Sequence, residues 1–165
     1  MVSPARRTLV DGLSEYDRLV EVGVGNRPGV ALALAKRGCR VVAVDVDLGD
    51  KAQAAARETR AGTVDGSLRV RREDVLALAE DAVEGDDRSA DAGEIAPVDA
   101  VYACHLPAEL QRPTVALADR LDAACVFTTL GFEEPILPVR RRSVAETTLY
   151  VARESEGGER RSGPG

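Results

Sequence analysis

The stretch Arg18–Gly25 reads RLVEVGVG, an apolar run that ends in two spaced glycines. It is short and rich in β-branched residues, which predicts a buried β-strand ending at Gly23. Residues 28–37 follow as a predicted helix, because proline suits a first helical turn and Gly38 suits a helix end. A strand, a glycine turn and a helix in this order indicate the beginning of a parallel α/β sheet.

The rest of the chain repeats this alternation of strands and helices. Further strands are predicted at 41–45, 68–70, 98–103, 124–130 and 147–152, and helices at 4–12, 51–60, 75–80 and 113–123. The short spacing predicts right-handed βαβ connections and a mostly parallel sheet. We therefore predict a single Rossmann-like α/β domain over residues 1–153. It is a three-layer sandwich shortened at the C-terminus, with one terminal strand.

Composition narrows the classes of partner. The chain has 165 residues and a formal net charge of -6, which does not favour nucleic acid, and Arg140–Arg142 is too short a basic run to reverse this. No apolar run reaches membrane-spanning length and the N-terminus lacks a signal pattern, so we expect a cytoplasmic protein. Residues 81–97 are predicted to be a mobile acidic loop, and residues 154–165 a disordered tail. The oligomeric state stays open.

The loop after the first strand is the first candidate binding site, because open α/β sheets bind ligands beyond the carboxyl ends of their strands. Gly23 and Gly25 permit positive φ angles and a close approach of ligand to backbone. The helix that follows directs free N–H groups at the same space, which suits a carboxylate or a phosphate. The alternative interpretation is a plain tight turn between a strand and a helix.

Glu21 lies two residues before Gly23, within the predicted strand. Glu21, Gly23 and Gly25 together resemble the first signature of class I S-adenosylmethionine-dependent methyltransferases. The resemblance implies that this loop holds the methionine part of the cofactor and that Glu21 helps to organise it. The third glycine of that family falls at Arg27, where this chain departs from the pattern. A dinucleotide spacing that uses Gly29 keeps NAD open as an alternative cofactor.

Two further acidic residues follow predicted strands. Asp45 ends the second strand about twenty positions after Gly25, a spacing at which a carboxylate meets ribose hydroxyls. Asp47 competes for this role, and Asp45 is alternatively a cap at the strand end. Asp74 follows the third strand, where the methyltransferase resemblance implies a contact with adenine. Its alternative role is a helix N-cap.

His105 is the only histidine of the chain and follows the fourth strand. Histidine side chains commonly serve as general bases near neutral pH, so His105 is the candidate catalytic residue. Its alternative is a structural hydrogen-bonding role. Cys104 is expected to point to the opposite face if the strand continues. A metal site needs three or more donors, and no such cluster is visible, so none is predicted.

Tyr102, Pro107, Glu109 and Leu110 form a Tyr-x-x-x-x-Pro-x-Glu-Leu segment. With the Val-Glu-Val-Gly-x-Gly start, this segment resembles a small group of archaeal Rossmann-like proteins, uncharacterised protein family 0146. The resemblance spans about residues 5 to 152 and implies no particular reaction. Three hypotheses therefore stand: a methyltransferase with an unknown acceptor, a non-catalytic nucleoside-binding module, and an NAD-binding protein.

Overall fold

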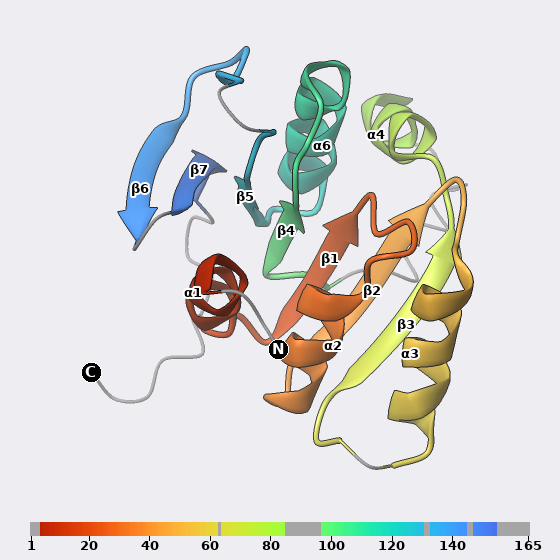
Figure 1. The fold of residues 1–165 in the computed structure, drawn as a ribbon. Helices are drawn as coiled ribbons and strands as arrows, with labels where there is room; N and C mark the ends of the chain where they lie inside the picture. Colours follow the sequence, from red (N-terminus) through yellow and green to blue (C-terminus); the bar gives the residue numbers. More distant parts are fainter. Residues whose placement is uncertain (1–3, 63, 85–96, 131–132, 145–146, 155–165) are drawn as a thin grey trace.

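The structure, a computed structural model, describes residues 4–62, 64–84, 97–130, 133–144 and 147–154. A seven-stranded sheet in the order β3-β2-β1-β4-β5-β7-β6 forms the middle layer (Figure 1). Strands β1 to β5 pair in parallel, and β7 is antiparallel to both β5 and β6. The strands are β1 Arg18–Val22, β2 Arg40–Asp45, β3 Ser67–Arg72, β4 Ala100–Ala103, β5 Ala124–Phe127, β6 Arg140–Val144 and β7 Thr147–Arg153.

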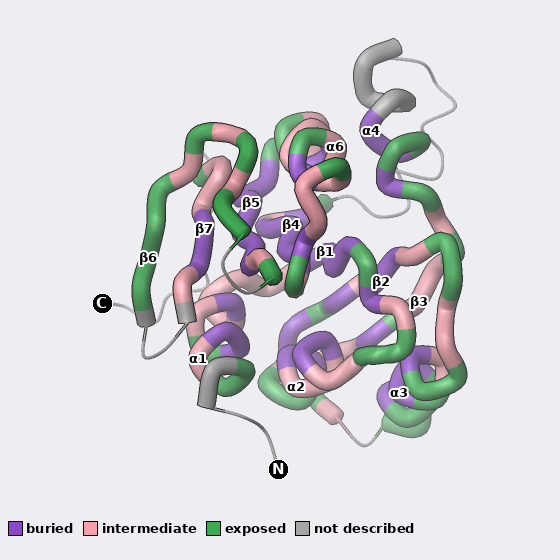
Figure 2. The backbone as a smooth tube through the Cα atoms, turned by 45° about the horizontal axis from the view of Figure 1, so that its top comes forward, coloured by how far each residue is buried: buried purple, intermediate pink, exposed green. Residues whose placement is uncertain are grey.

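Helices cover both faces of this sheet. One face packs against α1 Pro4–Leu13, α2 Gly29–Lys36 and α3 Asp50–Arg60, and the other against α4 Val75–Glu84 and α6 Ala108–Arg120. Figure 2 shows that β1, β4 and β5 are largely buried, whereas the edge strand β6 is exposed. Buried parallel strands read as continuous apolar runs, which is why their sequence signal is strong. The predicted mostly parallel, Rossmann-like α/β fold is confirmed.

The order of the strands determines where a ligand can bind. The chain builds β1 in the middle of the sheet, moves outward to β2 and β3, and then returns to place β4 on the other side of β1. The connections after β1 and β4 therefore lead away from each other, and a crevice opens between them at the carboxyl ends. The loop that contains Gly23 and Gly25, here called the glycine loop, follows β1, and His105 follows β4. Both therefore border this crevice.

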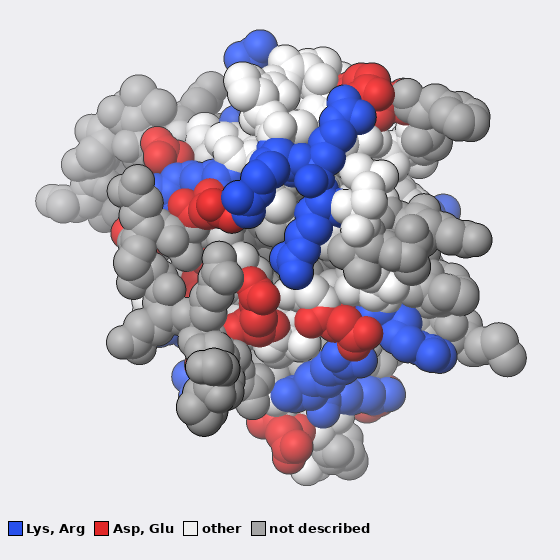
Figure 3. Space-filling model, turned by 90° about the vertical axis from the view of Figure 1, so that its left-hand side faces the viewer, with Lys and Arg blue, Asp and Glu red and all other residues white. Residues whose placement is uncertain are grey.

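The far end of the sheet differs from the prediction, because a β6–β7 hairpin stands where one terminal strand was expected. β6 carries Arg140, Arg141 and Arg142, a polar pattern that gives no strand signal. Charged side chains on an edge strand discourage its free backbone groups from pairing with other chains. Arg140 pairs with Glu154 and Arg141 with Glu134. Figure 3 views this side of the molecule and shows basic side chains in a band with acidic side chains beside it.

Helices α4 and α6 extend well beyond their predicted limits, each by more than one residue. Helix α6 begins at Ala108, although Pro113 was expected to open it. Pro113 cannot donate a hydrogen bond to the carbonyl of Glu109, but Glu109 is exposed, so water can bind that carbonyl instead. Helix α4 includes residues 81–84, which were expected to be loop. Of the rest of the expected acidic loop, residues 85–96 lie outside the described residues, as do residues 155–165 of the expected tail.

Candidate functional site

The loop after β1 takes a conformation that glycine permits. Gly23 and Gly25 have φ angles of 82° and 52°, in the left-handed region that other residues rarely adopt. The backbone N–H of Gly23 donates to the carbonyl of Val44 at 2.9 Å, which fastens the loop to β2. A side chain on Gly23 would meet no described atom within 4 Å, and Gly23 lines a pocket. The missing side chain thus leaves room for a ligand at the backbone.

Arg27 stands where the methyltransferase pattern has a third glycine. Among the described residues, the non-glycine positions with positive φ are His105 and Asp122. Arg27 therefore has an ordinary backbone conformation, and its N–H donates to the carbonyl of Val24 at 2.9 Å. The departure from the pattern costs this loop no strain, because no glycine is required at that position.

Hydrogen bonds with the end of β2 and the loop that follows it hold the glycine loop in place. Asp45 accepts a hydrogen bond from the N–H of Gly25 at 2.7 Å, and Asn26 accepts one from the N–H of Lys51 at 2.7 Å. The N–H of Gly49 donates to the carbonyl of Gly25 at 3.0 Å. A Cβ on Gly49 would lie 2.2 Å from Oδ1 of Asn26, so only glycine fits there without a shift. The loop is therefore fixed before any ligand arrives.

A pocket of about 900 Å³ opens at the carboxyl ends of β1, β4 and β5. Its size is that of a site for a small-molecule cofactor. Of the predicted site residues, it brings together Glu21, Gly23, Gly25 and His105. The other described lining residues are Arg6, Leu9, Val24, Asn26, Arg27, Gly29, Val30, Lys51, Cys104, Thr128, Thr129, Leu130, Thr148 and Tyr150.

Glu21 lies at the base of the pocket and is 2% exposed. It pairs in register with Tyr102 of β4, whose hydroxyl donates a hydrogen bond to Oε1 of Glu21 at 2.6 Å. Burial raises the pKa of Glu21 to about 7; the Tyr102 hydrogen bond lowers it, and the charge of Asp45 raises it. The Glu21 carboxyl therefore changes its charge near neutral pH.

Asp45 and Asp74 follow their strands as predicted but are not among the described lining residues. The carboxylate of Asp45 accepts from the N–H groups of Gly25, at 2.7 Å, and Asp47, at 3.3 Å. Asp74 accepts from the N–H of Leu76 at 2.9 Å at the beginning of α4. In the structure, Asp45 thus braces the glycine loop and Asp74 acts as a helix N-cap. A carboxylate has about four lone-pair sites, so both can accept further bonds.

The residues after β4 turn sharply into the pocket. His105 is exposed and has a φ of 54°, a conformation that is uncommon outside glycine and often marks functional sites. Its N–H donates to the Thr128 hydroxyl oxygen at 2.9 Å, which ties this turn to the end of β5. Cys104 also lines the pocket. It was expected to face away from His105 only if the strand continued, and that condition is not met. The reason is that β4 ends at Ala103, after which strand alternation no longer applies.

Sequence reasoning missed several lining residues. They include four residues on the β5–β7 side that carry hydroxyl groups, Thr128, Thr129, Thr148 and Tyr150. Thr128 and Thr129 directly follow β5, so a search of every strand end would have found them. Arg6 comes from α1, and no sequence signal places that helix over the pocket. Burial, followed by the charge of Glu21, raises the pKa of the Cys104 thiol, which keeps it protonated and weakly nucleophilic.

The described residues contain no group of three His, Cys, Asp or Glu side chains that could hold a metal ion. Within the same residues, no helix combines the length and the apolar character needed to cross a membrane.

Comparison with solved structures supports the fold. Magnesium protoporphyrin IX methyltransferase from Synechocystis with bound S-adenosylmethionine aligns with a TM-score of 0.54 and 15% identity, over 89% of this chain and 73% of that chain. An RNA methyltransferase from Salinibacter ruber in complex with S-adenosylhomocysteine aligns with a TM-score of 0.52 and 19% identity, over 96% of this chain and 98% of that chain. An NADB-Rossmann superfamily protein from Streptococcus agalactiae aligns with a TM-score of 0.58 and 12% identity, over 98% of this chain and 72% of that chain.

Comparison with protein families gives the relationship by sequence. The model described as "Uncharacterised protein family (UPF0146)" matches residues 3–77. UPF0146 proteins from two strains of Halobacterium salinarum are each 40% identical to this chain over 149 residues, or 90% of this chain and 96% of each relative. The chain therefore belongs to the uncharacterised protein family UPF0146.

Proposed function

We propose that this protein binds S-adenosylmethionine in the pocket at the carboxyl ends of β1, β4 and β5, and that it is a methyltransferase. The glycine loop carries the proposal. Gly23 and Gly25 hold positive φ angles and line the pocket together with the buried carboxyl of Glu21. S-Adenosylmethionine has an ammonium and a sulfonium group, and a desolvated carboxylate is a favourable partner for such cations. The fold shared with the Synechocystis and Salinibacter methyltransferases supports the same assignment.

Each predicted residue has a role in this proposal. Glu21 pairs with the cationic methionine part, and Gly23 and Gly25 allow it to lie against the backbone. Asp45 and Asp74 come at the carboxyl ends of β2 and β3, where they accept from the ribose hydroxyls and from the adenine amino group. The structure gives both carboxylates a backbone partner, so these contacts use the remaining lone pairs.

The cofactor supplies an activated methyl group when it is bound. The protein has to align the acceptor with that group and to accept a proton if the acceptor carries one. His105 lies in the pocket, and its backbone N–H is held by Thr128. We assign His105 as the proton acceptor. His105→Gln is then expected to abolish methyl transfer to a protonated acceptor while cofactor affinity stays within about twofold.

A phosphorylated nucleotide such as NAD is the second candidate ligand. Arg6, Arg27 and Lys51 all line the pocket, and a cluster of cations favours a phosphate over a sulfonium. The module would then bind its nucleotide without methyl transfer.

A thermal-shift panel of S-adenosylmethionine, S-adenosylhomocysteine, NAD, NADP and ATP tests the two candidates. A ligand present at about 100 times its Kd stabilises the folded state by about 2.7 kcal/mol, which a melting curve resolves easily. The proposal expects stabilisation by the first two compounds only. Stabilisation by NAD or ATP alone would support the second candidate and contradict the first.

Catalysis is tested separately with methyl-labelled S-adenosylmethionine and an extract of a Halobacterium salinarum strain that lacks its UPF0146 gene. Label transferred to an acceptor, and lost with His105→Gln, supports a methyltransferase. Binding of the cofactor without any transfer would favour the non-catalytic nucleoside-binding module.

A further inference from the structure

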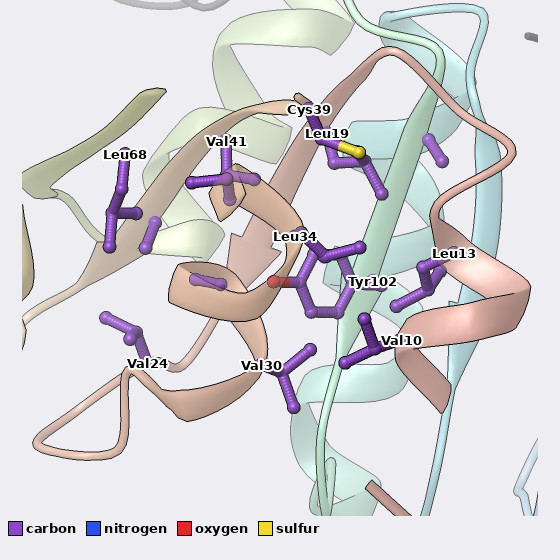
Figure 4. Close-up of a cluster of buried hydrophobic side chains, with 14 of the residues drawn as sticks. Val10, Leu13, Leu19, Val24, Val30, Leu34, Cys39, Val41, Leu68 and Tyr102 are labelled. Atoms are coloured by element: carbon purple, nitrogen blue, oxygen red, sulfur yellow. The ribbon is translucent and has the colours of Figure 1, made fainter. Parts of the chain in front are cut away.

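A buried tyrosine and a buried carboxyl face each other at the base of the pocket. Tyr102 is 0% exposed and Glu21 is 2% exposed, and the two lie directly opposite each other on neighbouring parallel strands. The hydroxyl of Tyr102 donates to Oε1 of Glu21 at 2.6 Å. Figure 4 shows the Tyr102 ring among apolar side chains of α1 and α2, including Val10, Leu13, Val30 and Leu34. Packing on both sides fixes the direction in which the hydroxyl points.

The charges around this pair do not balance a carboxylate. Besides burial, the groups that act on the pKa of Glu21 are the Tyr102 hydroxyl and Asp45 at the end of β2, and neither is a cation. At the end of β4, Cys104 keeps its thiol proton, and Arg6 of α1 acts on that thiol by lowering its pKa. A buried carboxylate with no matching cation is costly, so below about pH 7 the carboxyl holds a proton when the pocket contains only water.

Glu21 nevertheless lines the pocket. Arg6, Arg27 and Lys51 line the same pocket, but the groups that act on the pKa of Glu21 include none of them. A positively charged ligand group that enters the pocket can place a cation beside the carboxyl. We infer that Glu21 and Tyr102 form a proton-linked receptor for a cationic group of the ligand, in which Tyr102 positions the carboxyl and the arriving cation displaces its proton to solvent. This inference rests on the proposed function, because it takes the ammonium of an S-adenosyl compound as that cation.

The exchange is balanced without any other reactant. The O–H bond of the Glu21 carboxyl breaks, the proton leaves to the buffer, and the carboxylate pairs with the ligand cation. Since the pKa of Glu21 is about 7, the ligand affinity should be about tenfold weaker at about pH 6 than at about pH 8. The number of protons released per ligand should fall from about one at the lower pH to nearly none at the higher pH.

Tyr102 acts here as a positioning residue and not as a catalytic one. Its hydrogen bond favours the charged form of Glu21 and so lowers the pKa of the carboxyl. Tyr102→Phe removes only this bond, so the pKa of Glu21 should rise and the affinity curve should move to higher pH. Affinity lost by the variant at neutral pH should return at about pH 9. A purely structural role of Tyr102 would lower affinity at every pH alike.

The test is isothermal titration calorimetry of the whole protein with S-adenosylhomocysteine, in buffers of different ionisation enthalpy at about pH 6 and about pH 8. The wild type should release about one proton at the lower pH, and Glu21→Gln should release none. This comparison needs no Tyr102 variant, so the inference stays testable if Tyr102→Phe does not fold. Release that persists in Glu21→Gln would belong to another group, such as His105, and would overturn the assignment.

The outcomes also separate the inference from the function on which it rests. If S-adenosylhomocysteine and S-adenosylmethionine do not bind at any pH, the proposed function fails. If they bind with the same heat in every buffer, the proposed function stands and the proton-linked receptor is wrong. A Tyr102→Phe curve that superimposes on the wild-type curve would show that the tyrosine does not position the carboxyl.

Discussion

On the side of β1 and β2, the pocket wall is made of backbone that hydrogen bonds hold in place, whereas on the side of β4, β5 and β7 it is made of side chains. In the first wall, Asp45 holds Gly25 and Asn26 accepts from the N–H of Lys51. In the second wall, threonine and tyrosine residues line the space beside Leu130, which is 50% exposed. Under the proposed function, the fixed backbone wall would hold the cofactor and the wall of side chains would face the acceptor.

The largest effect is expected at Glu21 of β1, below the first wall at the base of the pocket. Folding raises the pKa of Glu21 from 4.5 to about 7. The protonated carboxyl therefore contributes fully to the free energy of unfolding below about pH 4.5, the pKa in the unfolded chain, and this contribution is lost as the pH rises through about 7. Glu21→Gln keeps the shape but cannot ionise. The unfolding free energy of Glu21→Gln minus that of the wild type should therefore increase by about 2 to 3 kcal/mol between about pH 5 and about pH 8. Urea unfolding at the two pH values measures this change.

Glu109→Gln is the matched control, because Glu109 is exposed at the beginning of α6. Its difference from wild type should stay within about 0.5 kcal/mol at both pH values. A Glu21→Gln difference that does not change with pH would mean that the buried carboxyl is not protonated near neutrality.

The next effect tests the bracing of the glycine loop. Asp45→Ala leaves the N–H of Gly25 without its acceptor and should cost about 1 to 2 kcal/mol of stability. Asp47→Ala is the control, because only the backbone of Asp47 takes part in this network and its side chain is exposed. The hydrogen-exchange rate of the Gly25 amide and the thermal stability are measured in both variants. Equal losses in the two variants would contradict a braced first wall.

The smallest effect is expected in the second wall. Thr128→Val keeps the side-chain shape but removes the oxygen that accepts from the N–H of His105, at a cost of about 1 kcal/mol. Thr129→Val is the control, because its hydroxyl bonds the carbonyl of Glu133 at an exposed position. Faster amide exchange at His105 in the first variant alone is the expected result. An unchanged rate would mean that Thr128 does not hold the turn.

Much of this architecture could be predicted because the buried strands have strong apolar signals. Parallel strands end at one edge of the sheet, so the order of strands and helices was sufficient to bring Glu21, Gly23, Gly25 and His105 to one pocket. Strand β6 was not predicted, because an edge strand with both faces near solvent needs no apolar pattern.

The finer geometry of the site depends on contacts between residues far apart in the chain. The bond between Glu21 and Tyr102 follows from the register of β1 and β4, which are 81 residues apart at this point. Packing sets that register, and no local pattern encodes it. The place of Cys104 in the pocket has a related cause, because β4 ends at Ala103 and strand alternation no longer applies at Cys104.

The central claim is that the glycine loop binds S-adenosylmethionine, and two matched glycine variants test it most directly. Gly23 and Gly62 have φ angles of 82° and 79°, and an added Cβ would meet no described atom within 4 Å at either. Gly23→Ala and Gly62→Ala should therefore carry similar backbone strain, but only Gly23 lines the pocket.

The measurement is isothermal titration calorimetry of S-adenosylmethionine into wild type and both variants at about pH 8. We predict saturable one-to-one binding that Gly23→Ala weakens by at least about tenfold and that Gly62→Ala leaves unchanged. Absence of binding to the wild type, or an equal loss in both variants, would contradict the account.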